Sequence, residues 1–286
     1  MGGPMCANLL KSGCRVYAMD AAEKSLERAA AAGAVKATPD MIGENADAVF
    51  LSLPNGGIVK DVLFGENGLA RHLKKGTVVA DTSSITPIEA KACFEALEKL
   101  GVDYVDCPVS GGEPGAVKGT LAFMAGGTEE AFHKLGPYFE ILGSSAVRIG
   151  PSGSGSVAKL ANQVIVNAGI AAVSEAFTLA VKCGADPEKV FLAIRGGLAG
   201  SAVLEAKVPM MIAHDFKPGG SLTINRKDIK NVLDTAHSVD VPMFLTSQLF
   251  EIMQALKVSG HMGDDHSGIV QFYEQMADVS VEKKSE

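Results

Sequence analysis

Two short stretches of the sequence hold residue types that could act on a small acid. The stretch "GSGSVAKLANQ" places Lys159 and Asn162 three residues apart, which puts them on one face of a helix. A lysine on an otherwise apolar helix needs an explanation, because burying an unpaired ammonium costs free energy. A solvated lysine is the alternative, and this segment alone leaves both interpretations open.

The second stretch is "DCPVSGGEPGAVKGTLAFMAGG", which begins at Asp106 and places Ser110, Gly111 and Gly112 at a predicted strand end. Two successive glycines can turn their N–H groups into one concavity, and a neighbouring serine hydroxyl completes a cradle for a carboxylate. A plain glycine-rich turn is the alternative interpretation.

A third group of residues is suited to a dinucleotide. In "MGGPMCANLLKSGCRVYAMD", Gly2 fits the last glycine of a nucleotide-binding turn, a helix follows, and Asp20 closes the next strand, where an acidic residue can hold a ribose. The segments "SLPN" and "DTSSITP" also follow predicted strands, and ligands bind beyond the carboxyl ends of parallel strands. Taken singly, each of these could be an ordinary turn or a flexible start.

The elements that must position these residues alternate up to about residue 150. Short β-branched runs lie at 15–19, 48–54, 77–83, 104–110, 121–127 and 146–150. Strands separated by helical stretches predict a mostly parallel sheet. After "GPSGSGS" the pattern becomes helical. The sequence therefore predicts an α/β chain with a Rossmann-type doubly wound parallel sheet over 1–152 and an all-helical domain over 153–286, which we expect to carry substrate binding and oligomerisation.

No strand precedes the glycine turn in this sequence. A doubly wound sheet places that strand near its centre, so its loss would leave unpaired strand edges inside the domain. We expect that the chain starts about ten residues late, judged from the usual length of a strand plus a glycine turn. A non-catalytic remnant of an enzyme is the alternative.

The composition of the chain limits which classes of binding partner and which cell compartment are expected. The chain has 286 residues, a formal charge of −7 and no basic run, which disfavours nucleic acid and anionic membranes. Its five cysteines show no C-x-x-C spacing, as expected for reduced thiols in the cytoplasm. The apolar run from Val164 is interrupted by Asn167, Ser174 and Glu175, which favours a buried helix over a lipid-facing one.

The ordered motifs together resemble the β-hydroxyacid dehydrogenase (3-hydroxyisobutyrate dehydrogenase-like) family over essentially the whole chain. They are "MGGPMCANLL", "DTSSITP", "DCPVSGGEPGAVKGTL", "GSGSVAKLANQ" and "NRKDIKNVLD". Within the family, "RGGLAGS" and "HMGDDHSG" look most like the tartronate semialdehyde reductase (2-hydroxy-3-oxopropionate reductase) branch. Related alternatives are 3-hydroxyisobutyrate dehydrogenase and a glyoxylate or succinic semialdehyde reductase.

The resemblance implies the role of each site residue. Lys159 would be the catalytic lysine, and Ser110, Gly111, Gly112 and Asn162 would hold the substrate. The dinucleotide would contact Leu53, Pro54, Ser84 and Lys227, besides Gly2 and Asp20. The reaction would be hydride transfer from NADH to a small carboxylated aldehyde, with proton donation by Lys159.

Three further expectations concern the cofactor, metals and assembly. NADH is expected over NADPH, because Asp20 is followed by "AAEK" without an arginine for a 2′-phosphate. No metal is expected: the residues His261, Asp264, Asp265 and His266 are interpreted as helix caps. The long apolar helix suggests a homodimer or homotetramer.

Overall fold

The computed structural model describes residues 1–282, which form two compact units. The first comprises Met1–Lys159 and the second begins at Leu160. The division falls inside helix α9 (Ser154–Lys182), whereas the sequence analysis places it at 152/153. Each unit has its own hydrophobic core, so each is described separately.

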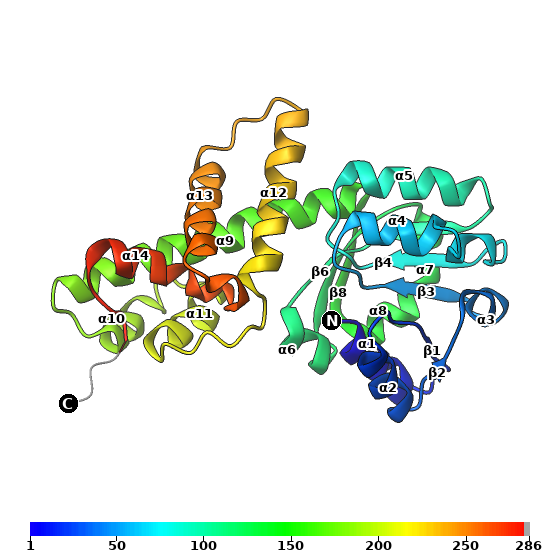
Figure 1. The fold of residues 1–286 in the computed structure, drawn as a ribbon, viewed down its shortest axis with the longest axis horizontal. Helices are drawn as coiled ribbons and strands as arrows, with labels where there is room; N and C mark the ends of the chain where they lie inside the picture. The colour runs from blue at the N-terminus through cyan, green and yellow to red at the C-terminus, as the bar shows by residue number, and fades with distance from the viewer. Residues whose placement is uncertain (283–286) are drawn as a thin grey trace. The chain divides into compact units, whose positions relative to one another are not determined.

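The first unit contains a six-stranded sheet of order β3-β4-β5-β7-β6, with β8 paired to β7. Figure 1 shows the neighbouring strands β3 and β4 of this sheet. Its strands are β3 (Ala48–Leu51), β4 (Val78–Asp81), β5 (Asp103–Asp106), β6 (Val109–Ser110), β7 (Leu121–Gly126) and β8 (Gly143–Gly150). Strands β3, β4 and β5 are parallel, and β7 is antiparallel to β5 and β6. The predicted α/β architecture is confirmed, with a sheet that is mixed rather than parallel throughout.

The mixed pairing has a local cause. The run expected as one strand over 104–110 is divided into β5 and β6 at Cys107 and Pro108, and proline cannot donate to a strand ladder. Strand β6 then leads through the short helix α6 (Gly112–Lys118) into β7. This connection is too short for the crossover that parallel neighbours require, so β7 runs antiparallel.

Helices cover both faces of this sheet because side chains alternate along each strand. Val78 and Ala80 of β4 belong to a core with α1 (Gly2–Lys11), α6, α7 (Glu129–Lys134) and α8 (Gly136–Leu142). Val79 belongs to a core on the other face, with α3 (Pro39–Asn45), α4 (Gly56–Phe64) and α5 (Pro87–Glu98). All four β4 residues are buried, as in the centre of a doubly wound sheet.

A second, two-stranded parallel sheet pairs β1 (Tyr17–Ala18) with β2 (Val35–Lys36), and α2 (Glu23–Ala31) connects them. A doubly wound sheet of order 3-2-1-4-5-6 has one strand between those that correspond to β1 and β3. Among residues 1–282, no strand occupies that place. Both strands therefore have an edge without a ladder partner in the described chain.

The second unit is helical, as predicted. Its elements are the C-terminal part of α9, α10 (Pro187–Ile194), α11 (Ala202–Ile212), α12 (Leu222–Ser238), α13 (Phe244–Val258), α14 (Val270–Ala277) and the 3₁₀ turns η2 (His261–Gly263) and η3 (His266–Ile269). The side chains of Asp186, Ser201 and Ser221 cap α10, α11 and α12, which explains where these helices start.

Helix α9 is long and apolar enough to span a membrane, judged by length and composition alone. Ile170 and Phe177 of this helix lie in the core of the second unit. Its buried Asn167 and Ser174 side chains donate to the carbonyl oxygens of Gln163 and Ile170, at 3.0 and 2.8 Å. One face of this helix therefore belongs to the core of the second unit.

Candidate active site

The loops that follow β3 and β4 are bonded to each other. Leu51 and Asp81, the last residues of the two strands, are partners in the ladder. Beyond them, the Leu53 N–H donates to Ser83 Oγ at 2.9 Å, and Thr82 Oγ1 donates to the Leu51 carbonyl at 2.6 Å. The predicted cofactor residues Leu53, Pro54 and Ser84 therefore belong to two loops at one end of the sheet.

The N-terminus of α1 lies beside this strand end. A Cβ atom built on Gly2 would lie 3.5 Å from Ser52 Cβ, in ordinary van der Waals contact. In the described chain, the N-cap residue Met1 gives no side-chain hydrogen bond to the first turn of this ten-residue helix. Unsatisfied N–H groups at a helix start suit a phosphate, so these residues fit a dinucleotide pyrophosphate.

Asp20 follows β1 and is exposed. Its Oδ1 atom accepts a hydrogen bond of 2.8 Å from the Ala22 N–H, just before α2. The carboxylate thus shapes the turn between β1 and α2, and its exposure leaves it accessible to a ligand.

The predicted carboxylate cradle has the backbone that its glycines suggest. Ser110 ends β6, and Gly111 and Gly112 follow with φ angles of 126° and 60°. Residues with side chains rarely adopt this left-handed region. Both glycines are exposed, so this turn is open to solvent and has no side chain that blocks the backbone.

Lys159 is tied to the strand that leads into this turn. Its Nζ atom donates a 2.9 Å hydrogen bond to the carbonyl oxygen of Val109, the residue before Ser110. The ammonium and the Ser110 cradle are therefore held by the same short strand, although Lys159 is about 50 residues further along the chain.

Two buried carboxylates behind these loops were not singled out by the sequence analysis. Asp81 ends β4 and Asp106 ends β5, and burial raises the pKa of each carboxyl to about 6. Hydrogen bonds limit both rises: Asp81 accepts from Ser83 N–H and Tyr104 Oη, and Asp106 accepts from Gly153 and Ser156 N–H. The sequence feature that could have indicated them is an acidic residue at the end of each apolar strand.

In the second unit, Asn162 and Lys227 are joined by a short polar chain. Asn162 Nδ2 donates to Gln163 Oε1 at 3.0 Å, and Gln163 Nε2 donates to Asp228 Oδ2 at 2.6 Å. Lys227 Nζ lies 2.8 Å from the other Asp228 oxygen. Gln163 and Asp228 were not predicted as site residues, because only the folded chain brings residues 163 and 228 together.

The four residues interpreted as helix caps, His261, Asp264, Asp265 and His266, make hydrogen bonds or ion pairs, and Asp265 is a helix cap. His261 Nδ1 lies 3.0 Å from Asp264 Oδ2, and Asp265 caps η3 and pairs with Lys207 at 2.7 Å. His266 Nδ1 lies 3.3 Å from Asn167 Oδ1. Over residues 1–282, no group of three or more His, Cys, Asp or Glu side chains could hold a metal ion.

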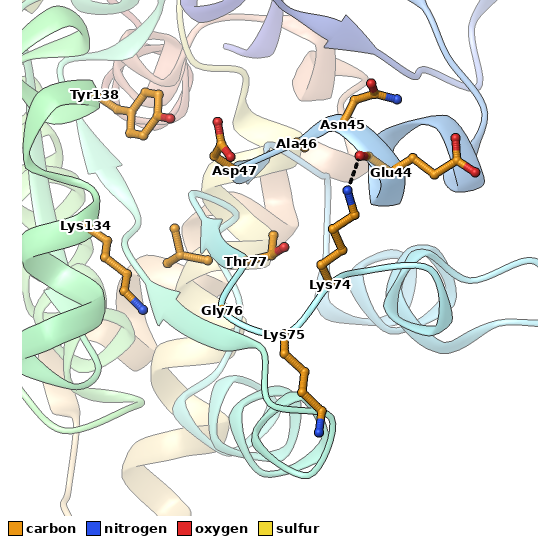
Figure 2. Close-up of a pocket in the computed structure, with 11 residues that line it drawn as sticks. Glu44, Asn45, Ala46, Asp47, Lys74, Lys75, Gly76, Thr77, Lys134 and Tyr138 are labelled. Atoms are coloured by element: carbon orange, nitrogen blue, oxygen red, sulfur yellow. Dashed lines mark hydrogen bonds between the residues drawn. The ribbon is translucent and has the colours of Figure 1, made fainter.

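A pocket of about 420 Å³ lies at the opposite end of the strands (Figure 2). It is lined by Asp47 and Thr77, which precede β3 and β4, together with Lys74, Lys134 and Tyr138. Because ligands of doubly wound sheets bind beyond the carboxyl ends, this pocket is separate from the candidate site.

Two family models match this chain, one over its α/β part and one over its helical part. Residues 1–150 match the family described as the NAD binding domain of 6-phosphogluconate dehydrogenase. Residues 153–273 match the family described as NAD-binding of NADP-dependent 3-hydroxyisobutyrate dehydrogenase.

Individual relatives align over nearly the whole chain. It is 38% identical over 277 residues to 2-hydroxy-3-oxopropionate reductase of Escherichia coli (strain K12), covering 97% of this chain and 95% of that one. It is 35% identical over 283 residues to 2-(hydroxymethyl)glutarate dehydrogenase of Eubacterium barkeri, covering 98% and 94%. The solved structure of Mycobacterium tuberculosis 3-hydroxyisobutyrate dehydrogenase with L-serine is 29% identical, with a TM-score of 0.86 and coverage of 95% and 94%.

Proposed function

The chain belongs to the β-hydroxyacid dehydrogenase family of NAD(P)-binding oxidoreductases that act on CH–OH donors, and on this premise we propose that it reduces 2-hydroxy-3-oxopropionate to glycerate with NADH. The observation that carries the proposal is the hydrogen bond from Lys159 to Val109. It fixes a proton donor one residue away from a turn suited to a carboxylate. The named activity of the Escherichia coli relative supports the choice of aldehyde.

Different residues of this chain are assigned to substrate binding and to proton donation. The Ser110 hydroxyl and the N–H groups of Gly111 and Gly112 bind the substrate carboxylate, and Asn162 orients the carbonyl group. Lys159 would donate a proton to the carbonyl oxygen, and a nicotinamide, when bound, would supply the hydride. This explains how a protein of charge −7 binds an acid: a few local donors are sufficient, without a positive overall field.

Cofactor binding is assigned to the N-terminus of α1, to the loops that follow β1, β3 and β4, and to Lys227 of α12. The N-terminus of α1 at Gly2 would hold the pyrophosphate, and Leu53, Pro54, Ser84 and Lys227 would contact the dinucleotide. Asp20 accepts the ribose hydroxyls and repels a 2′-phosphate. We therefore propose NADH as the preferred cofactor. We also propose cytoplasmic localisation, which is supported by the five cysteines without C-x-x-C spacing.

A panel of aldehydes tests this proposal. NADH oxidation is followed with 2-hydroxy-3-oxopropionate, methylmalonate semialdehyde, succinic semialdehyde and glyoxylate, and each is repeated with NADPH. We expect the highest kcat/KM for 2-hydroxy-3-oxopropionate with NADH. A higher value for methylmalonate semialdehyde would identify a 3-hydroxyisobutyrate dehydrogenase instead. Equal or better kcat/KM with NADPH would contradict the role of Asp20, and failure to bind either dinucleotide would favour a non-catalytic chain.

A further inference from the structure

Two buried carboxylates lie side by side at the ends of adjacent strands. Asp81 and Asp106 are partners in the β4–β5 ladder, and their exposed fractions are 0% and 1%. Buried charges are costly, and here both carboxylates accept backbone N–H groups. Asp81 is hydrogen-bonded to the loop after β4, which belongs to the predicted cofactor site. Asp106 is hydrogen-bonded to the start of α9, which carries Lys159.

Asp81 holds the loops assigned to the cofactor. Its Oδ1 accepts the Ser83 N–H at 2.9 Å, and its Oδ2 accepts the Tyr104 hydroxyl at 2.9 Å. Ser83 Oγ in turn accepts the Leu53 N–H at 2.9 Å. One carboxylate therefore determines the shape of the loop after β4 and, through Ser83, the place of the loop after β3.

Asp106 holds the first turn of α9, which carries Lys159. Its two oxygens accept the N–H groups of Gly153 and Ser156 at 2.7 and 2.8 Å. These donors have no partner inside a helix that starts at residue 154. The turn also sits tightly on the strands: a Cβ atom on Gly155 would lie 2.2 Å from the Asp106 carbonyl oxygen. Ser156 lies one helical turn before Lys159.

We propose that Asp81 and Asp106 are separate positioning residues, Asp81 for the cofactor loops and Asp106 for the lysine. The inference rests on the proposed function, because it takes Lys159 as the proton donor and Leu53 and Ser84 as cofactor contacts. A carboxylate suits this task since its two oxygens can accept two donors at once, whereas an asparagine side chain offers one oxygen. The two donors are the Ser83 N–H and the Tyr104 hydroxyl at Asp81, and two N–H groups at Asp106. The hydrogen bonds to ionised Asp106 are of the stronger, charge-assisted kind.

The test compares Asp81→Asn with Asp106→Asn, each serving as the other's control. Two readouts need no substrate: the NADH dissociation constant, and the rate of reductive methylation of Lys159 measured by peptide mass spectrometry. We expect Asp81→Asn to weaken NADH binding about tenfold or more with an unchanged methylation rate. Asp106→Asn is expected to change the methylation rate about tenfold and lower kcat, with NADH binding within about twofold.

Asp103→Asn is a further control, because this residue starts β5 and pairs with Lys134 at the other end of the strand. It should alter neither readout. If both buried substitutions shifted both readouts equally, or if neither shifted any, the carboxylates would have no separate positioning roles and the inference would be wrong. If the wild-type protein bound NADH but reduced no aldehyde, the proposed substrate would fail while these two readouts would still decide the inference.

A measurement on the wild-type protein covers the case in which a variant does not fold. The Gly153 N–H precedes α9 and donates to Asp106, so its protection from hydrogen exchange reports this bond. We expect the Gly153 and Ser156 amides to exchange as slowly as those of β4. Exchange as fast as that of an exposed loop would show that Asp106 does not hold the turn.

Discussion

At the residue scale, the chemistry depends on contacts between positions far apart in the sequence. The hydrogen bond from Lys159 to Val109 and those from Gly153 and Ser156 to Asp106 each span about 50 residues. The residue types of the site could be recognised from short motifs. The partners that hold them could not, because no local pattern indicates which backbone groups a buried carboxylate will accept.

Ser110 provides a direct test of the carboxylate cradle. Ser110→Ala removes one hydroxyl donor and leaves the backbone of Gly111 and Gly112 in place. We expect KM for the aldehyde acid to rise about tenfold, the effect of losing one hydrogen bond to a charged group, with kcat within about threefold. Steady-state kinetics at saturating NADH measures both values. An unchanged KM would place the substrate carboxylate elsewhere.

Asp106 should also determine part of the pH dependence of stability. Because the pKa of its carboxyl is raised to about 6 in the folded protein, the folded state binds this proton more tightly than the unfolded state, where the usual pKa is about 3.9. The tighter proton binding stabilises the folded state fully below pH 4, and this stabilisation is lost as the pH rises through 6. The Asp106→Asn variant has no carboxyl at this position, so its stability lacks this contribution at every pH.

Relative to Asp106→Asn, the wild-type free energy of unfolding should therefore fall by about 2 kcal/mol between pH 4.5 and 7. Urea unfolding of both proteins at the two pH values measures this difference. A constant difference would mean that the carboxyl titrates normally in the folded protein.

At the element scale, all six strand runs expected from the sequence contain strands. The two-residue strand β2 was missed, because it is too short to show a period of two. The division of β5 from β6 at Pro108 and the reversed direction of β7 were also missed, since pairing direction depends on connections and tertiary contacts. The helical second unit was easier to predict, because α9 is long and α10, α11 and α12 start at side-chain caps.

The open edge of β3 gives a prediction for its amides. The backbone N–H and C=O groups of Leu51 point toward β4, since the Leu51 carbonyl oxygen accepts the Thr82 N–H. Those of Val49 point the same way, because alternate residues of a parallel strand direct their backbone groups to the same neighbour. Ala48 and Phe50 therefore direct their N–H groups to the edge where no strand pairs within residues 1–282. Their amides should exchange about a hundredfold faster than those of Val49 and Leu51. Equal protection, measured by NMR, would show that another segment pairs with this edge.

At the scale of the whole molecule, α9 carries apolar side chains that the described residues, 1–282, leave exposed. Ile165 and Leu179 are 72% and 66% exposed, and they lie near one face of the helix because two heptads separate them. An exposed apolar stripe of this kind favours association. We propose that it contributes to a homodimer or homotetramer.

Light scattering coupled to gel filtration tests this assembly. The wild-type protein should have two or four times the 29.6 kDa mass of the chain, and Ile165→Lys should lower it. Leu192→Lys is the matched control, since Leu192 is 63% exposed on α10, and it should leave the mass unchanged. A monomeric wild-type protein would contradict the proposal.

The central claim is that Lys159 donates the proton during reduction of 2-hydroxy-3-oxopropionate, and turnover of Lys159→Ala with this aldehyde and NADH tests it most directly. Loss of a positioned general acid should lower kcat by about two to four orders of magnitude, with the NADH dissociation constant within about twofold. Lys189→Ala, an exposed lysine on α10, should keep wild-type turnover. A Lys159→Ala protein that kept more than a tenth of wild-type turnover would show that the lysine does not take part in the chemical step.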